Sequence, residues 1–208
     1  MKMKKAPKIS LLVVLLSIAT LMNAQTYRLE VGYNNPDRTG VGYSNTYFNG
    51  IRLGGTAEFD LKNNLSLLTG VLYNFVYSFK IQGYPNSKSV SYESFGHFVD
   101  IPLRITYTYP LTKDLKIFGF AGPNLNIGLG QTMKTTSTVS SIPDALSDLY
   151  KDAVLNRLNF QLGAGGGVQW KTYQFKAGYD FGINNLNKVS GAGNLNQKGW
   201  YVSVAYQF

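Results

Sequence analysis

The sequence predicts an all-β fold: an eight-stranded antiparallel transmembrane β-barrel preceded by a cleavable signal peptide. Eight runs of the chain alternate apolar with polar residues at a period of two, the pattern of strands whose two faces meet different surroundings. The connections between these runs are alternately long and short. The last run ends on the aromatic Phe208, as the closing strand of a membrane barrel does.

The first 24 residues predict an export signal. Four lysines precede an apolar run from Leu11 to Met22. That run is shorter than the roughly 20 residues of a membrane-spanning helix, and Ala24 offers a small residue for cleavage. We therefore expect a signal peptide at 1–24 and a barrel domain at 25–208, with an uncleaved anchor helix as the alternative.

The first four predicted strands have apolar rows rich in aromatic and branched residues. Residues 27–33 alternate tyrosine, leucine and valine with arginine, glutamate and glycine. Residues 51–59 alternate isoleucine, leucine, alanine and phenylalanine with polar residues and glycine, and 65–79 form the longest run. In 99–107, valine, isoleucine, leucine and tyrosine alternate with aspartate, proline, arginine and threonine. Such apolar residues favour strands.

Four further runs complete the predicted barrel. Residues 115–129 set leucine and isoleucine against asparagine, glycine and lysine; 158–170 set leucine, phenylalanine and tryptophan against glycine and amides. Residues 173–183 and 200–208 repeat the pattern. Eleven residues that rise ~3.3 Å each and tilt by ~40° span about 28 Å, enough for an apolar band ~25 Å tall. Eight is also an even number, as in single-chain bacterial barrels.

The connections predict which end of the barrel lies where. Short turns would face the periplasm with both termini, and the long loops would form the outer surface; the long ones are 34–50, 80–96, 131–157 and 184–199, and the short ones 61–64, 110–114 and 171–172. Within the third long loop, residues 141–144 read as a capping box that opens a short helix over 145–155. That helix would either cover the barrel mouth or offer an apolar stripe to a partner.

Charge on the polar rows separates a membrane barrel from a soluble one. A soluble ligand-binding barrel would turn its apolar face inward, whereas here the polar rows carry the charges. In a barrel of eight strands these side chains would fill the lumen and have to pair. We expect a salt-bridged plug, with a proton or ion pathway as the alternative, formed by Arg28, Glu30, Arg52, Glu58, Asp100, Arg104, Lys116, Lys176 and Asp180. Arg157 has the same predicted orientation.

Aromatic residues on the apolar rows gather near the strand ends. Two such girdles fit the two interfaces of a bilayer. The predicted membrane-interface anchors are Tyr27, Tyr107, Trp170, Trp200 and Phe208. The expected location is therefore the cell outer membrane of a Gram-negative bacterium.

Three segments and the aromatic C-terminus resemble the outer-membrane β-barrel domain proteins of Bacteroidota, the PorT-like and OmpX-like small barrels. The segments are Phe98–Arg104, Gly119–Asn126 and Gly163–Gly167. The resemblance covers nearly all of the mature chain and implies the fold and compartment far more than an activity. Pro102 lies inside one of these segments, where a ladder hydrogen bond is lost, so we expect a local bulge there.

Little in the sequence indicates catalysis. The glycine-rich stretches lack the context of a nucleotide-binding loop. With one histidine, His97, and no cysteine, no zinc-type cluster is expected, and we predict no metal, no cofactor and no catalytic residue. The alternative is a lipid-modifying enzyme in which His97 works with Ser94, Glu93 or Asp100.

The expected function is a structural or surface-interaction role, with the long loops as the contact surface. The resemblance also allows an accessory role in envelope assembly or protein secretion, and a narrow pore is a further alternative. Expected partners are outer-membrane lipid and lipopolysaccharide, the barrel-assembly machinery through the C-terminal strand, and an envelope protein through the loops. Nucleic acid is not expected because the basic residues of the mature chain are scattered. We expect a monomer.

Overall fold

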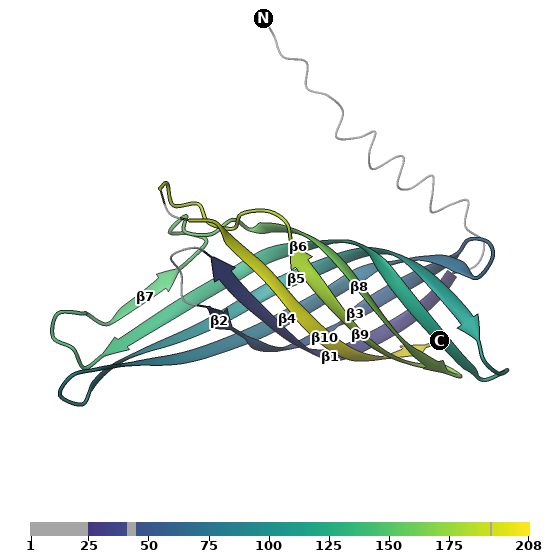
Figure 1. Cartoon of the computed structure of the whole chain (residues 1–208), viewed down its shortest axis with the longest axis horizontal. Coiled ribbons are helices and arrows are strands. Elements are labelled where there is room, and N and C mark those ends of the chain that lie inside the picture. The colour runs from purple at the N-terminus through teal and green to yellow at the C-terminus, as the bar shows by residue number, and fades with distance from the viewer. Residues whose placement is uncertain (1–24, 41–44, 192) are drawn as a thin grey trace, which may run out of the picture.

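Eight antiparallel strands close into a ring (Figure 1). The computed structural model describes residues 25–40, 45–191 and 193–208, so the predicted signal peptide lies outside the described residues. Each ring strand pairs with its neighbour along the chain, and the first pairs with the last. The predicted eight-stranded barrel is thereby confirmed; its strands are β1 (Gln25–Gly40), β3 (Asn49–Asp60), β4 (Leu65–Tyr84), β5 (Lys88–Pro110), β6 (Leu115–Ser137), β8 (Leu158–Trp170), β9 (Tyr173–Gly182) and β10 (Leu195–Gln207).

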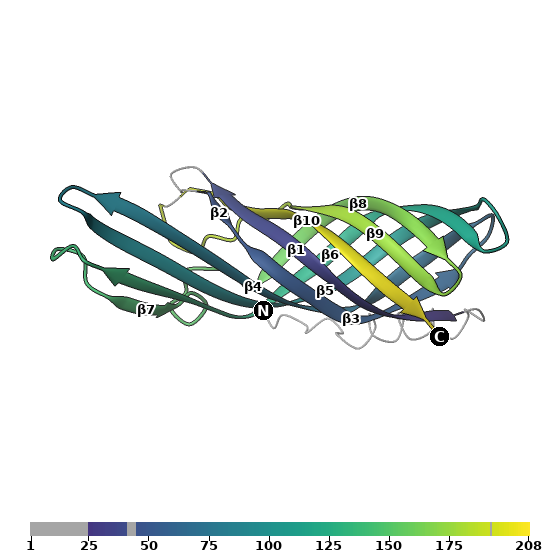
Figure 2. The ribbon, with the colours of Figure 1, turned by 90° about the horizontal axis from the view of Figure 1, so that it is seen from below.

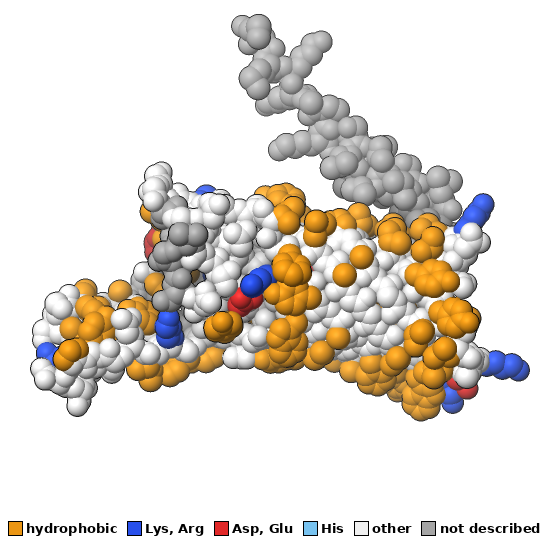
Figure 3. All heavy atoms as spheres, viewed as in Figure 1, with side chains coloured by type: hydrophobic (Ala, Val, Ile, Leu, Met, Phe, Trp, Pro, Cys, Tyr) orange, Lys and Arg blue, Asp and Glu red, His pale blue; other side chains and the backbone are white. Residues whose placement is uncertain are grey.

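The period of two sorts the side chains between wall and lumen. In β10, Val202 and Val204 are exposed on the outer wall while Tyr201 and Ser203 are buried inside. Apolar side chains therefore dominate the outer wall, as Figure 3 shows for one face. This arrangement suits a barrel whose outside meets lipid.

The two ends of the barrel differ. At one end, here called the turn end, short connections join β3 to β4, β5 to β6 and β8 to β9. Asn63 and Asn64 take positive φ values of 55° and 65° in the first of these turns, which asparagine tolerates better than most residues. The opposite end, here called the loop end, carries the long connections.

The predicted loops 80–96 and 131–157 are partly wrong, because three ring strands continue beyond the ring and a short fourth strand joins them (Figures 1 and 2). We call this extension the projecting sheet: residues 78–84 of β4, 88–96 of β5, 130–137 of β6, and β7 (Ala145–Asp148). Its residues pair with one another across these strands. The loop 34–50 is likewise shortened, since β1 runs to Gly40 and β2 (Thr46–Tyr47) pairs back on it. Threonine and tyrosine favour strands without giving the apolar alternation of a membrane wall.

The predicted helix over 145–155 is also wrong. Residues 145–148 form β7 instead, and no helix of the described residues is long and apolar enough to cross a membrane. The Asp144 carboxylate accepts a hydrogen bond from the Ser137 amide at 2.8 Å and does not cap a helix. Leu155 and Tyr150 are buried at the loop end, so the helical spacing of apolar residues reflects packing into the barrel mouth.

The bulge expected at Pro102 lies elsewhere. The register between β5 and β6 shifts between His97 and Phe98. Toward β4, the pairs made by Asp100 and Leu103 on either side of Pro102 keep a single register. A proline removes one donor but inserts no residue, so the flanking pairs hold the strands in place.

Gly122 carries the strongest backbone requirement near this proline. Its φ is +151°, and a Cβ there would lie 3.1 Å from the Arg104 Cα. Gly122→Ala should therefore lower the free energy of unfolding by about 1–3 kcal/mol. Gly130→Ala on the same strand is the control, because nothing lies within 4 Å of its Cβ position. Urea unfolding of the refolded barrel measures the stability of both variants. Equal stability would contradict the backbone requirement for glycine at position 122.

Candidate functional site

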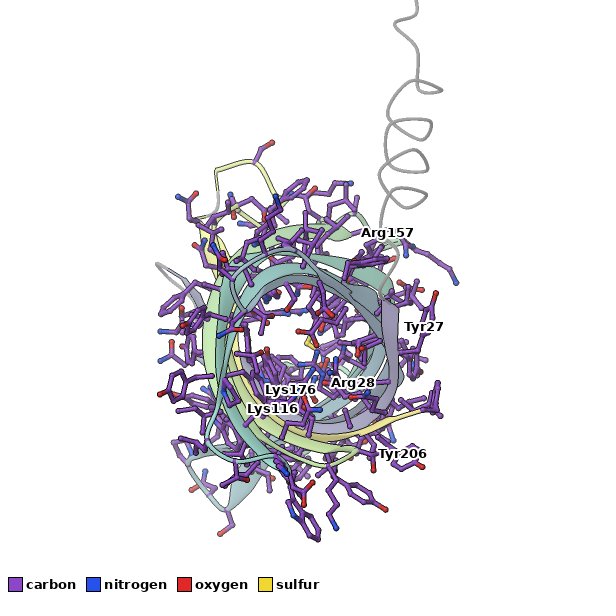
Figure 4. The ribbon with its side chains drawn as sticks, turned by 90° about the vertical axis from the view of Figure 1, so that its right-hand side faces the viewer. Tyr27, Arg28, Lys116, Arg157, Lys176 and Tyr206 are labelled. Carbon is purple, nitrogen blue, oxygen red and sulfur yellow. The ribbon has the colours of Figure 1, made fainter. Side chains whose placement is uncertain are left out.

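The polar rows of the strands face the inside of the ring. Seen from the turn end, Arg28, Lys116 and Lys176 point into the lumen, while Tyr27 and Tyr206 point away from it (Figure 4). The lumen is therefore the first place to look for chemistry.

Near the turn end, Arg28 of β1 forms an ion pair with Glu58 of β3. Ser66 of β4 donates a hydrogen bond to the same carboxylate. Arg28 also lies 3.5 Å from the Gln169 side-chain oxygen of β8, across the lumen. Both ionised groups are buried, so each satisfies the charge of the other.

In the middle of the barrel, Glu30 lies between two cations. One carboxylate oxygen is 2.5 Å from the Lys176 Nζ and the other 3.5 Å from the Arg52 Nε. Arg52 in turn stacks over the Tyr201 ring, 4.1 Å from its centroid. This cluster joins β1, β3, β9 and β10 through the lumen.

A second central cluster balances two aspartates in different ways. Asp180 pairs with Arg104, which also donates to the Gly122 carbonyl. Asp100 instead accepts hydrogen bonds from three amides: Asn74 at 2.9 Å, Asn124 at 3.2 Å and Asn126 at 2.7 Å. Amide donors stabilise a carboxylate without a counter-charge.

The loop end is closed by apolar side chains, which we call the mouth cap: Phe48, Val76, Phe98, Tyr150, Leu155, Leu186 and Leu195. Arg38 is buried among them, with its guanidinium 5.2 Å from the Phe48 ring centroid and 5.7 Å from that of Phe98. It donates to the Gln197 side chain at 2.9 Å. Burial raises the pKa of the Tyr150 hydroxyl, so this group stays neutral beside the arginine.

The space left inside is uneven. Two cavities of about 40 and 20 Å³ lie among the central side chains, room for a few waters. A larger hollow of about 370 Å³ opens at the turn end and is lined by Arg28, Glu58, Lys116 and Gln169 among others. The lumen thus consists of an open hollow at the turn end and a closely packed region between that hollow and the loop end.

Two of the expected lumen residues are not buried. Lys116 is exposed at the rim of the turn-end hollow. Arg157 is also exposed: it donates to the carbonyls of Gly128 and Leu129 at 3.0 and 2.8 Å and lies over the Tyr150 ring. The structure brings the other eight proposed lumen residues inside the ring.

His97 lies on the outer wall, on the same face of β5 as Glu93, one of the three groups proposed to assist it. Its Nδ1 is 2.6 Å from the Tyr73 hydroxyl, and its ring packs 5.2 Å from that of Phe75. Ser94 and Asp100 are buried on the opposite face of the strand. The sheet therefore separates the histidine from both.

The five proposed interface anchors all lie exposed on the outer wall: Tyr27, Tyr107, Trp170, Trp200 and Phe208. Trp200 packs 5.4 Å from Tyr33 toward the loop end, and Phe208 packs 6.1 Å from Tyr206 at the turn end. Rings at these two levels suit two membrane interfaces.

Sequence reasoning missed several lumen groups. The amides of Asn74, Asn124 and Asn126 lie on polar rows, so strand parity was an available signal. Arg38 fell within an expected loop and gave no signal. Among the described residues, no group of histidine, cysteine, aspartate and glutamate is placed to hold a metal ion.

Comparison with known proteins identifies a family. Residues 17–188 match the model of the family described as outer membrane protein beta-barrel domain. No curated protein sequence matches the chain.

Solved structures with a similar arrangement share little sequence. Ail, the attachment invasion locus protein of Yersinia pestis, is 13% identical with a TM-score of 0.37, over 88% of this chain and 98% of that chain. Neisserial surface protein A is 13% identical with a TM-score of 0.43, over 89% of this chain and 100% of that one. The outer membrane enzyme PagL is 13% identical with a TM-score of 0.37, over 88% and 99%. Likeness this weak carries no argument about what the chain does.

The cluster around Glu30 predicts a large effect on stability. Glu30→Gln leaves Arg52 and Lys176 buried without their carboxylate, so the free energy of unfolding should fall by about 3–5 kcal/mol. Adding Lys176→Met removes one stranded charge and should restore part of the loss. Denaturant unfolding in detergent measures both variants. If Glu30→Gln alone were as stable as the parent barrel, the Glu30 carboxylate would not be stabilising the two cations.

Proposed function

The chain belongs to the outer membrane protein beta-barrel domain family, and on that premise we propose that it is a surface-contact protein of the bacterial outer membrane. In this proposal the ring spans the bilayer with its turn end toward the periplasm. The projecting sheet then stands outside the membrane and forms the contact surface.

The contrast between the filled lumen and the exposed surface of the projecting sheet carries the proposal. The central lumen is filled by paired charges and capped by apolar side chains, so the ring offers no wide passage to a solute. The projecting sheet instead exposes large apolar side chains beyond the ring: Phe79 at 51%, Ile81 at 60% and Leu146 at 75%. Phe79 and Ile81 are neighbours on one face of β4, and adjacent apolar side chains exposed outside a membrane favour a protein contact.

The alternatives have less support. A role in envelope assembly or secretion, as in PorT-like barrels, would use the same surface with another envelope protein as partner. A lipid-modifying enzyme built on His97 has only Glu93 of its three expected partners on the same face of β5, because Ser94 and Asp100 are buried on the other face. A narrow pore would have to pass the ion pairs of Arg104 and Glu30.

The exposed side chains of the outer wall suggest further partners. We propose that the outer wall binds outer-membrane lipid and lipopolysaccharide through its aromatic anchors, and that the barrel works as a monomer. The exposed row of β10, together with Phe208 directly after it, is the proposed signal for the assembly machinery.

A photo-crosslinking amino acid at Phe79 tests the proposal in intact cells. Phe160 on the outer wall of β8 is a matched control, because it is also phenylalanine and also 51% exposed. The Phe79 probe should give discrete adducts of protein size, and the Phe160 probe should give lipid adducts alone. Replacing residues 81–91 by an Asn-Gly turn, which favours a tight hairpin, should remove the protein adducts. Equal protein adducts at both positions would refute a dedicated contact surface.

A further inference from the structure

One side of the projecting sheet ends in a bare strand edge. Toward the loop end, the pairing between β3 and β4 stops at Asn49, the first residue of β3, which faces Tyr77. Strand β4 continues for seven residues beyond that point, and β5 backs it on its other side as far as the Tyr84–Lys88 pair. We call residues 78–84 the β4 edge. In the described part of the chain no strand pairs with it on the β3 side.

The ladder geometry shows which backbone groups face outward from this edge. The Leu61 amide donates to the Leu65 carbonyl, so odd-numbered residues of β4 direct their N–H and C=O groups toward β3. The Thr108 amide donates to the Asn64 carbonyl, so even-numbered residues are directed toward β5. Along the edge, Phe79, Ile81 and Gly83 therefore point three N–H and three C=O groups away from the sheet.

The mouth cap explains why the chain leaves this edge bare. A straight continuation of β3 in the same register would place residue 47 opposite Phe79. Instead Phe48 is buried in the cap, 2% exposed, and its amide donates to the Pro36 carbonyl at 2.8 Å. Thr46 and Tyr47 then pair with β1. Burial of one aromatic ring thus draws the chain away from β4.

We propose that the β4 edge binds an extended segment of another protein by β-strand addition. The proposal rests on the surface-contact function and supplies its chemistry. Outward N–H and C=O groups that recur every second residue, about 6.6 Å apart, match the backbone of a strand. A segment of about seven residues would meet all three donors and all three acceptors.

The side chains along the edge define the segment further. Phe79 and Ile81 lie exposed on one face of the sheet, and Lys80 and Gln82 are exposed on the other. Lys88 adds a second exposed cation next to the end of the edge, opposite Tyr84. The matching segment alternates apolar residues with acidic or polar ones.

A second copy of this chain fits the edge less well. Two copies inserted in one membrane have parallel axes, so both β4 strands run away from the bilayer. A two-fold axis along the membrane normal cannot make them antiparallel, which is how β4 pairs with both of its neighbours. A segment of another protein has no such restriction.

Hydrogen exchange with a tethered probe tests the pairing directly. The chain has no cysteine, so Lys88→Cys supplies a single thiol for attaching a heptapeptide of alternating valine and glutamate through a short flexible linker. The tether holds the probe at millimolar effective concentration. Amide exchange at Phe79, Ile81 and Gly83 should slow at least tenfold on attachment. Exchange at Lys80 and Gln82 should not change, because their amides already bond to β5.

Matched variants separate backbone pairing from side-chain contact. Ile81→Pro removes an outward N–H without touching the ladder to β5, and edge strands tolerate proline. With the probe attached, this variant should lose the protection at Phe79 and Gly83, whereas Ile81→Val should keep it. A probe that is N-methylated at alternate residues should protect neither. Unchanged exchange at Phe79, Ile81 and Gly83 on attachment of the unmodified probe would overturn strand addition.

The cell experiment distinguishes this inference from the function on which it rests. Adducts at the Phe79 probe that disappear in Ile81→Pro but not in Ile81→Val support strand addition. Adducts that persist in Ile81→Pro but are lost when 81–91 are replaced refute strand addition and leave the surface-contact function standing. Adducts that survive both changes refute the function as well. An adduct of twice the mass of this chain would identify a second copy as the occupant and overturn the proposal.

Discussion

The structure depends on one constraint: a closed ring of eight strands removes the charges of the central lumen from bulk water. Leaving a buried ion unpaired costs more free energy than most single contacts contribute. Each inward carboxylate is therefore stabilised by a cation or by hydrogen-bond donors. Glu58 pairs with Arg28, Glu30 is held between Lys176 and Arg52, and Asp180 pairs with Arg104. Asp100 uses amide donors. Long side chains need space, and inward glycines supply it; a Cβ at Gly163 would overlap the Asp180 carboxylate.

The same closure moves any contact with other molecules to the ends of the barrel. Because the lumen is occupied, the cap at the loop end can be apolar, and three connections contribute to it through Phe48, Tyr150 and Leu186. The position of Phe48 has a consequence outside the cap, since it ends the pairing between β3 and β4 at Tyr77. The projecting sheet and its bare edge thus follow from how the mouth is closed.

The wall of the barrel could be predicted from the sequence and its interior only in part. Alternation at a period of two identifies strands and assigns each residue to a face, which placed Glu30 and Lys176 in the lumen. It cannot say that these two meet, because their contact depends on the register of strands 146 positions apart in the chain. The projecting strands were missed because polar residues such as Ser89 and Thr135 show no apolar row. The helix over 145–155 failed because Leu149 and Tyr150 pack into the mouth rather than along a helical face.

Conductance across a planar bilayer tests the central claim most directly. If paired charges close the lumen, the refolded barrel of residues 25–208 should show no steady conductance above that of the bare bilayer. Replacing both Arg104 and Asp180 by alanine removes one such pair and loosens the plug, so this variant should conduct at least as well as the unmodified barrel. A steady conductance in the unmodified barrel that falls when these charges are removed would contradict the account, because the charges would then conduct ions instead of blocking them.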